Sequence, residues 1–564
     1  MPDIWPALPL LVGALLAGFA RGHVRAIVML AAPILGALNV YHLDSGTHTQ
    51  LAFLGQWLTP VRVDSLSLLF GYLFHLAALI GVIYALHLRD RLQQVAALAY
   101  AASAVGAVFA GDLLTLFVYW ELLAITSAVL VFARRSDASL GAGIRYLVMQ
   151  IGSGVLLLAG AILYARSTGS LAFDHIGIDA PGGWLIFIAF GIKCAFPMLH
   201  GWLTDAYPEA TPTGTVFLSA FTTKVAVYAL ARGFAGTELL IGIGALMTCF
   251  PIFYAVIEND LRRVLAYSLI NQLGFMVVGI GIGTELALNG AVAHAFNDVI
   301  FKGLLMMSMG AVLHVTGEMR GSELGGLYKK MPKTALLCMV GAASISAFPL
   351  FSGFVSKSMV VSAALQEGHS VVWLALLFAS AGVFHHAGIK IPFFAFFAHD
   401  SKYVATAHEP PVNMLIAMAI AAVLCVGIGS FPAYLYALLP YDTGYSPYDV
   451  SHVLAQLQLL AFSALAFTWL KLAQIYPPEL RSVNLDVDWL YRRLMPDTIS
   501  ATLARLAPLD RRLRNQGTMV VQAGLQGVAR HHGRYGVLAG SWPTGSMVIW
   551  VAALLGLSLL LYYV

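Results

Sequence analysis

Charged residues are scarce in this sequence. Of its 564 residues only 11% are Asp, Glu, Lys or Arg, whereas 59% are hydrophobic. A soluble domain carries about 25% charged residues and is about half apolar, so this composition excludes an ordinary water-soluble protein. We therefore expect an integral membrane protein that folds as a single polytopic bundle.

Cysteine and net charge are also low. The four cysteines, Cys194, Cys249, Cys338 and Cys425, lie singly in apolar stretches, so no disulfide, haem or iron–sulfur ligation is expected. The formal net charge of +4 is spread over short connections and gives no indication of nucleic-acid binding. The sequence has no Walker motif and no GxGxxG loop in a βαβ context, so we expect neither a nucleotide site nor a cofactor.

Long apolar stretches recur along nearly the whole chain, and about 20 such residues cross a bilayer as a helix. The first stretch lacks a basic segment and an AxA cleavage site, so we expect a retained span and not a signal peptide. We predict an all-α polytopic membrane protein with about 14–16 transmembrane helices. The sixteen stretches run near 5–20, 24–40, 65–87, 92–110, 113–133, 143–165, 184–203, 213–232, 236–257, 263–283, 286–314, 333–352, 371–397, 413–431, 452–472 and 546–563.

Basic residues segregate with the predicted spans. If the spans cross in order, the connections that follow odd-numbered spans share one side of the membrane, here called the odd side. Up to residue 333, the odd side and its edges carry Arg21, Arg25, Arg89, Arg91, Arg134, Arg135, Arg145, Arg262, Arg263, Arg320, Lys329, Lys330 and Lys333. The other side carries Arg62, Arg166 and Arg232. The positive-inside rule therefore predicts a cytoplasmic odd side and an external N-terminus.

Several ionisable residues fall deep inside predicted spans, where each costs at least about 2.5 kcal/mol on insertion scales. They are Glu121, Lys193, Lys224, His294, Lys302, Lys357 and Lys390. Such groups either form buried ion pairs or snorkel to an interface, or they carry protons. The structural alternative is favoured for Lys390, which is nearest a span end. For the others a relay is favoured, because the lysines outnumber the carboxylates and a lysine without a full-time counter-ion can lose its proton.

Two spans are expected to be broken. Pro197 follows Lys193 by four residues, and Pro349 with Gly353 interrupts the stretch that leads to Lys357. Interrupted helices in corresponding places of two five-span blocks indicate an inverted repeat, although two unrelated proline kinks would leave the same pattern.

Between Tyr476 and about Pro543 the share of charged residues rises. This segment predicts either an amphipathic helix lying along the membrane or against neighbouring subunits, or a solvated connector.

These observations divide the chain into six regions. We predict N-terminal transmembrane helices, a first and a second inverted-repeat half-channel, peripheral helices, a cytoplasmic polar or amphipathic segment and a C-terminal transmembrane helix. Their bounds are 1–91, 92–232, 233–397, 398–475, 476–543 and 544–564, in that order.

From about residue 60 to 400 the sequence resembles the antiporter-like subunits of respiratory complex I and of Mrp-type multisubunit cation/proton antiporters, most closely the D-type subunits of the latter. Several motifs in fixed order carry the resemblance. They are GDLLTLFVYWELLAITSAVLVF (111–132), IKCAFPMLHGWLTDAYPEATPTGTVFLSAFTTKVAVYAL (192–230), RRVLAYSLINQLGFMVVGIGIG (262–283), HAFNDVIFKGLLMMSMG (294–310) and LGGLYKKMPKTALLCMVGAASISAFPLFSGFVSK (324–357).

The resemblance implies a fourteen-helix core with two inverted five-helix repeats. It also implies roles in a proton path: Glu121 and Lys193 in the first half-channel, Lys224 as the link between halves, His294 and Lys302 as the continuation, and Lys357 near the exit.

The sequence departs from the family at two places. Asn297-Asp298 stands where many D-type subunits have a His-Asp pair, and Ser219 stands where complex I relatives often have histidine. The relay is therefore expected to use Asp298, His294 and water.

The predicted function is that of a proton-translocating subunit of a multisubunit Na⁺ or K⁺/proton antiporter in a bacterial inner membrane, with other membrane subunits as partners. An alternative is the proton-channel subunit of a complex I-like dehydrogenase, a membrane hydrogenase or an inorganic-carbon uptake complex, that is, part of a redox- or substrate-driven translocase. A third possibility is a structural scaffold. Because hard cations need several oxygen ligands, proton transfer is better supported than sodium binding. Hydroxyls such as those of Thr222 and Thr223, or another subunit, would have to supply a sodium site.

Overall fold

The computed structural model describes residues 4–53, 55–477, 479–480, 484–538, 540 and 543–563. Residues 478, 481–483, 539, 541 and 542 of the predicted polar segment lie outside the described residues, as do residues 1–3 and 564 at the ends of the first and last predicted regions. The chain divides into two units, Met1–Asp486 and Val487–Val564.

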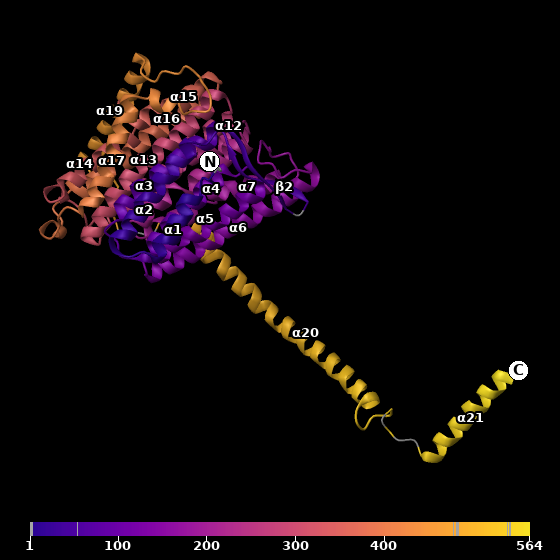
Figure 1. The fold of residues 1–564 in the computed structure, drawn as a ribbon. Helices are drawn as coiled ribbons and strands as arrows, with labels where there is room; N and C mark the ends of the chain where they lie inside the picture. Colours follow the sequence, from indigo (N-terminus) through magenta and orange to yellow (C-terminus); the bar gives the residue numbers. More distant parts are fainter. Residues whose placement is uncertain are drawn as a thin grey trace. The chain divides into compact units, whose positions relative to one another are not determined.

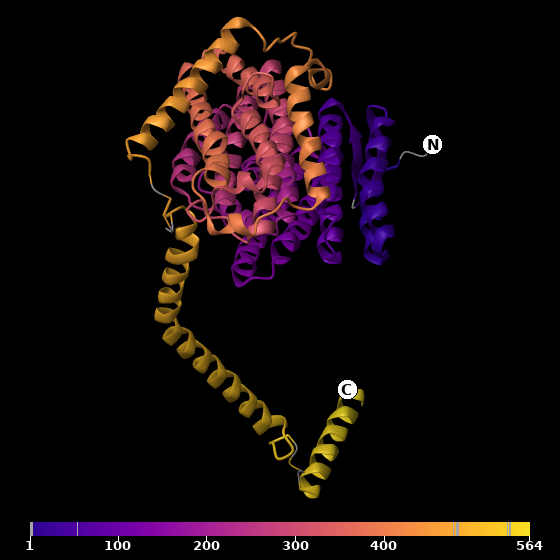
Figure 2. The ribbon, with the colours of Figure 1, turned by 90° about the vertical axis from the view of Figure 1, so that its left-hand side faces the viewer.

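The first unit is built almost entirely of helices (Figures 1 and 2). Its first half contains α1 (Leu8–Phe19), α2 (Gly22–Tyr41), α3 (Ser65–Ala85), α4 (Arg91–Phe109), α5 (Leu113–Phe132), α6 (Asp137–Thr168), α7 (Gly183–Lys193), α8 (Gly201–Glu209), α9 (Gly214–Ala220) and α10 (Thr222–Gly233). Its second half contains α11 (Leu239–Ile257), α12 (Leu261–Ile282), α13 (Glu285–Thr316), η1 (Leu327–Lys329), α14 (Pro332–Ile345), α15 (Ser352–Gln366), α16 (Ser370–Val383), η2 (Phe384–Lys390), η3 (Phe393–Phe397), η4 (Lys402–Ala405), α17 (Val412–Ser430), α18 (Ala433–Tyr436) and α19 (Val450–Leu472).

The predicted polytopic membrane fold is confirmed. Thirteen helices of the described residues are long and apolar enough to cross a membrane, and three shorter apolar helices, α1, α7 and α14, accompany them. Each of the sixteen predicted stretches contains a helix. Helix α15 was missed: the helix in the stretch predicted at 333–352 ends at Ile345, and α15 follows as a separate helix.

A short antiparallel hairpin also escaped prediction. Strands β1 (Gly46–Phe53) and β2 (Gln56–Val63) pair with Gly46 opposite Val63. The backbone of Thr59 in β2 donates to the Asp112 carboxylate (2.8 Å) and accepts from the Gly111 amide (2.9 Å). The hairpin therefore holds the connection between α4 and α5 in place.

Aspartates begin several of the helices. Asp64, Asp90, Asp112 and Asp260 each accept hydrogen bonds from backbone amides in the first turn of α3, α4, α5 and α12, respectively. These amides have no partner within the helix, so the caps satisfy them where apolar spans start.

Small residues let the long helices approach closely. Where α11 crosses α12, a Cβ atom at Gly244 would meet backbone atoms of Gly274 and Val278, and one at Gly274 would meet backbone atoms of Thr248 and Gly244. Helices in a lipid environment gain from such close van der Waals contact, because lipid tails offer no hydrophobic driving force between them.

Ion pairs connect loops that the predicted order of spans places on the same side of the membrane. Loops that follow odd-numbered spans pair with one another, and loops that follow even-numbered spans do likewise. The contacts are Arg135–Asp90 and Lys329–Asp400 on the odd side, and Arg232–Asp64 and Arg62–Asp174 on the other.

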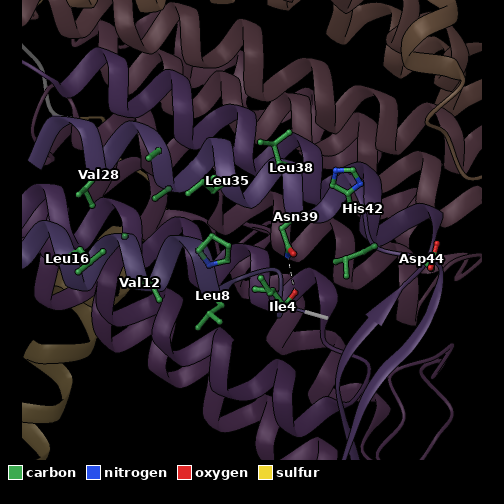
Figure 3. Close-up of a pocket in the computed structure, with 15 residues that line it drawn as sticks. Ile4, Leu8, Val12, Leu16, Val28, Leu35, Leu38, Asn39, His42 and Asp44 are labelled. Atoms are coloured by element: carbon green, nitrogen blue, oxygen red, sulfur yellow. Dashed lines mark hydrogen bonds between the residues drawn. The ribbon is translucent and has the colours of Figure 1, made fainter. Parts of the chain in front are cut away.

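A groove of about 950 Å³ lies between α1 and α2 (Figure 3). Its walls are apolar, and Asn39, His42 and Asp44 gather at one end. The Asn39 amide donates to the backbone carbonyl of Ile4 (3.0 Å). None of the predicted buried charges lines this groove.

The second unit contains η5 (Leu490–Leu494), α20 (Met495–His532) and α21 (Thr544–Tyr563). Helix α20 is about 57 Å long at 1.5 Å per residue. Apolar residues recur along it at three- and four-residue spacing, as at Ile499, Leu503, Leu506 and Leu513, which makes it amphipathic. No described residue of α20 or α21 is buried.

Candidate functional site

Two helix breaks of the same design frame the candidate site. Residues 195–198 and 347–350 read Ala-Phe-Pro-Met and Ala-Phe-Pro-Leu. In both segments the first and last residues have positive φ, 60° and 70° in the first break and 58° and 73° in the second. In both, the Phe amide donates to a carbonyl five residues earlier, at 2.9 and 3.0 Å.

Left-handed backbone is unfavourable for residues other than glycine, so the surrounding structure must impose it. The breaks separate α7 from α8 and α14 from α15. Both prolines predicted as break residues lie within them, whereas Gly353 is the second residue of α15. A Cβ atom at Gly353 would overlap the Ser344 carbonyl oxygen, so this glycine allows close packing across the second break. The repeated tetrapeptide is a sequence signal for the breaks that the prolines alone did not provide.

Glu121 points from α5 against α6. Its Oε1 atom is buried and makes no hydrogen bond to the described residues. A Cβ atom at Gly154 of α6 would overlap this oxygen. Glycine at position 154 therefore creates the space that the carboxyl group occupies.

Lys193 is fully buried at the end of α7, directly before the first break. Its Nζ atom donates to the Trp120 carbonyl (2.6 Å) and lies 4.6 Å from the centre of the Trp120 ring. Trp120 is the neighbour of Glu121 in sequence, and Lys193 and Glu121 interact electrostatically. Ser153 holds the indole by accepting from its Nε1 atom (2.9 Å).

Lys224 on α10 forms an ion pair with Asp298 on α13, with Nζ and Oδ2 2.5 Å apart and both side chains fully buried. Lys224 also donates to the Ser219 carbonyl (3.1 Å), which lies just before the irregular turn between α9 and α10. Ser219, which stands where complex I relatives often have histidine, thus accepts a hydrogen bond from Lys224 through its backbone carbonyl. The pair connects the two predicted half-channels.

Two more predicted residues, His294 and Lys302, are held by neutral partners. His294 donates through Nε2 to Gln272 Oε1 (3.1 Å) and shares a hydrogen bond through Nδ1 with Ser356 Oγ (3.0 Å). Lys302 donates to Ser268 Oγ (2.8 Å). Because Gln272 Oε1 is an acceptor, the arrangement places a proton on Nε2 of the imidazole.

Lys357 lies beyond the second break and reaches back across it to the Ile345 carbonyl (3.1 Å). Its Nζ atom also lies 4.9 Å from the centre of the Phe275 ring. Lys193 and Lys357 therefore each combine a backbone carbonyl with an aromatic face, but only the Ile345 carbonyl lies beside a break, since Trp120 is inside α5.

One carboxylate serves several of these lysines. Asp298 pairs directly with Lys224 and interacts electrostatically with Lys302 and Lys357. Sequence reasoning anticipated the excess of lysines over carboxylates but not which lysine holds the counter-ion.

Lys390 stands apart from this group. Its Nζ atom donates to the carbonyls of Ala255, Val256 and Glu258, at 3.2, 2.7 and 2.7 Å, and forms an ion pair with Glu479 (2.9 Å). The ammonium group thus closes the C-terminal end of α11, where the helix dipole favours a cation.

Among the described residues, no group of three or more His, Cys, Asp or Glu side chains is placed to hold a metal ion. Tyr100 and Thr222 share a hydrogen bond (2.6 Å), while Thr223 Oγ1 is buried without a partner in the described part of the chain.

Known proteins resemble the chain over most of its length. The family described as NADH:quinone oxidoreductase/Mrp antiporter, TM, matches residues 110–385. The D-type subunit of an Na(+)/H(+) antiporter of Alkalihalophilus pseudofirmus is 26% identical over 475 residues, which cover 77% of this chain and 95% of the relative. Hydrogenase-4 component B of Escherichia coli is 26% identical over 488 residues, which cover 76% of this chain and 72% of the relative.

A solved structure shares the fold. A chain of the membrane-bound sulfane sulfur reductase, an archaeal respiratory membrane complex, superposes with a TM-score of 0.72 at 22% identity, covering 98% of this chain and 99% of that one. The family match spans both breaks and all the buried charges from Glu121 to Lys357. Residues 110–385 of the chain therefore match the NADH:quinone oxidoreductase/Mrp antiporter transmembrane family.

Proposed function

We propose that the protein is the proton-translocating subunit of a multisubunit monovalent cation/proton antiporter. The observation that carries the proposal is the sharing of Asp298 among buried lysines: it pairs with Lys224 and acts at longer range on Lys302 and Lys357. The similarity to a D-type Na(+)/H(+) antiporter subunit over 95% of that relative's length supports the same function.

The proposed path begins at Glu121 and Lys193. The carboxyl group takes up a proton and passes it to neutral Lys193, whose ammonium form is held by the Trp120 carbonyl. A charged Lys193 then favours release of the proton that Lys224 carries, because like charges disfavour each other. Water between the buried polar groups would carry the proton over gaps longer than a hydrogen bond.

The second half continues the path. When Lys224 gives up its proton, Asp298 loses its partner and favours a charged Lys302 or Lys357 in its place. His294, held between Ser356 and Gln272, lies within electrostatic range of Lys224, Lys302 and Lys357 and can exchange a proton with any of them. Lys357 beyond the second break then acts as the donor toward the exit. Each transfer leaves the number of protons unchanged and moves one positive charge.

The two half-channels are proposed to be inverted repeats, 92–232 and 233–397. The shared Ala-Phe-Pro tetrapeptides and their matching backbone support this division. We further propose that the membrane is a bacterial inner membrane, that the odd side faces the cytoplasm and that the N-terminus lies outside. The excess of arginine and lysine in the odd-side loops supports this orientation.

Other membrane subunits are the proposed partners. An amphipathic helix of 38 residues with no buried residue, followed by an apolar helix that is also unburied, has too much apolar surface to stand alone. A partner subunit would also have to supply most of a cation site, because the apolar spans offer few carboxylates.

A second candidate is a proton-channel subunit of a hydrogenase or another redox- or substrate-driven complex. The observation in its favour is the similarity to hydrogenase-4 component B, at the same 26% identity. The buried charges would carry protons in the same way in such a complex. The two candidates therefore differ only in the reaction that drives proton movement.

Inverted vesicles from antiporter-deficient cells provide the test. The chain is expressed with its neighbouring genes, and proton movement is followed when Na⁺ or K⁺ is added. We expect cation-dependent proton movement that Lys224→Ala abolishes at equal protein level. A well-assembled native complex without any cation response would overturn the antiporter function in favour of the second candidate. Normal transport by Lys224→Ala would overturn the relay.

A further inference from the structure

His386 is a buried histidine that the path described above does not use. Its side chain is fully buried. Neither ring nitrogen makes a hydrogen bond to the described residues, although the Gly382 carbonyl one turn earlier faces the ring. An imidazole buried with at most one backbone carbonyl as a partner costs free energy, so its place in the core needs an explanation.

The local backbone is also unusual. Residues Phe384–Lys390 of η2 form a π-helix that continues α16. Such turns are rare and occur frequently at functional sites. Gly388 in η2 lies against Ser346 at the second break, where a Cβ atom would overlap the serine hydroxyl. The widened turn therefore packs η2 against the end of α14, directly before the second break.

Charged groups of two helices act on the ring. Lys302 of α13 interacts electrostatically with His386, as do His385 and Lys390 of its own helix. Lys390 follows His386 by four residues, which places both on one face of the helix. The imidazole thus interacts both with a predicted relay lysine and with Lys390, whose ammonium group lies at the odd-side end of α11.

A carboxylate occupies that odd-side end. Glu479, only 5% exposed, is held by the ion pair with Lys390 (2.9 Å). Three backbone carbonyls fix the same ammonium group at the end of α11. Glu258 lies beside them and accepts from the Asn484 amide (3.0 Å). Lys390 is therefore a fixed charge that positions Glu479.

The geometry points to a second proton-uptake branch, in which Glu479 takes protons from the odd side and His386 passes them to Lys302. The inference rests on the proposed function, since it adds a route to the same relay. A proton bound by the Glu479 carboxylate moves to a ring nitrogen of His386, and the carboxylate regains its negative charge beside Lys390. The imidazolium then gives a proton to neutral Lys302 and returns to its neutral form.

The test uses the complete complex in inverted vesicles, whose exposed face is the cytoplasmic one. Initial rates of Na⁺- or K⁺-dependent proton movement are compared for the native chain, His386→Gln and Glu479→Gln. His385→Gln is the matched control, because His385 is the preceding residue and stacks on Tyr476 with ring centres 5.4 Å apart. Lys224→Ala reports on the proposed function itself.

Because the route through Glu121 stays open, we expect His386→Gln and Glu479→Gln each to slow transport about threefold at equal protein level, and His385→Gln to leave it at the native rate. Imidazole added to His386→Ala should restore part of the rate, which a structural role of the histidine would not produce. If the Gln variant fails to assemble, the imidazole response of the Ala variant decides.

The outcomes separate the two proposals. Native rates in His386→Gln together with an inactive Lys224→Ala would overturn this inference alone. Slow transport by His386→Ala without any imidazole response would likewise overturn it. A native complex without cation-dependent proton movement would overturn the proposed function on which it rests.

Discussion

Asp298 on α13 is the direct counter-ion of Lys224 on α10, at 2.5 Å and with both side chains fully buried. The bond joins the helices that end the first predicted half-channel and run through the second. The direct counter-ion also distinguishes Lys224 from Lys193, Lys302 and Lys357. The ammonium groups of these three lysines donate to carbonyl or hydroxyl oxygens.

Removing one partner of this pair should destabilise the protein. We expect Asp298→Asn to lower the stability of the assembled protein by up to about 3–5 kcal/mol, because it leaves a buried ammonium without its counter-ion. The double variant Lys224→Met/Asp298→Leu should regain stability and still fail to transport protons. Thermal unfolding in detergent and vesicle transport measure the two effects.

Asp174→Asn is the matched control for that change. Asp174 pairs with Arg62 but its side chain is 66% exposed, so the expected loss is at most about 1 kcal/mol. Equal losses of stability in Asp298→Asn and Asp174→Asn would contradict the importance of the buried pair.

Gly154 should be essential for Glu121. We expect Gly154→Ala to slow proton transport about tenfold or more, because the new methyl group would occupy the position of Glu121 Oε1 and displace the carboxyl group from Lys193. Gly152→Ala on the same helix is the control, since a Cβ atom there meets nothing within 4 Å. Transport rates in vesicles are the measurement. Similar rates for the two alanine variants would refute the prediction.

The stability of the protein should depend on which residue occupies position 198 in the first break. Met198 has a φ of 70° and its side chain is 62% exposed, so packing contributes little at this position. We expect Met198→Val to destabilise the protein by about 1–2 kcal/mol, because left-handed backbone is unfavourable for a β-branched residue. Met198→Asn should retain native stability, since asparagine tolerates this conformation. Thermal unfolding compares the two, and a valine variant as stable as the asparagine variant would show that the break carries no strain.

Stability should depend on pH through Glu318 in the loop after α13. The Arg320 side chain and the backbone amides of Met319 and Arg320 donate to this carboxylate and lower the pKa of Glu318 to about 2. The stabilisation is therefore complete above pH 4.5, the ordinary pKa, and is lost as the pH falls from there toward 2. At pH 7 the melting temperature of Glu318→Gln should lie below that of the native protein. The difference between the two melting temperatures should shrink as the pH falls.

Melting temperatures between pH 7 and pH 3 check this dependence. The exposed Glu367 provides the control variant Glu367→Gln, which should melt like the native protein throughout. A difference between native and Glu318→Gln protein that stays constant over this range would rule out the carboxylate as its source.

The depth of each buried charge could be predicted because an α-helix rises 1.5 Å per residue from a span boundary. Glu121, Lys193 and Lys302 were placed inside spans in this way. The choice of partners could not be predicted, since the pairing of Lys224 with Asp298 depends on how α10 and α13 face each other across the bundle. Ser268 and Gln272 were missed for the same reason: single polar residues in an apolar helix give no sign of the side chain they will contact.

Local backbone was harder to predict than spans. The hairpin at 46–63 lies between two apolar stretches and is too short to alter the hydropathy pattern. Helix α15 was joined in part to its predecessor because the Ala-Phe-Pro-Leu break is itself apolar. The π-helical turn at 384–390 has no known sequence signature, and the positive φ values of Ala195 and Ala347 concern residue types that rarely adopt them.

The sharing of Asp298 by Lys224, Lys302 and Lys357 bears on how well the membrane would stay sealed. In the proposed relay, one fixed negative charge compensates about one ammonium group, so a second proton would enter against uncompensated repulsion. A proton would then reach these lysines only as another leaves them. Passive leakage down the gradient, which requires independent occupancy of the sites, would be suppressed without any gate that closes.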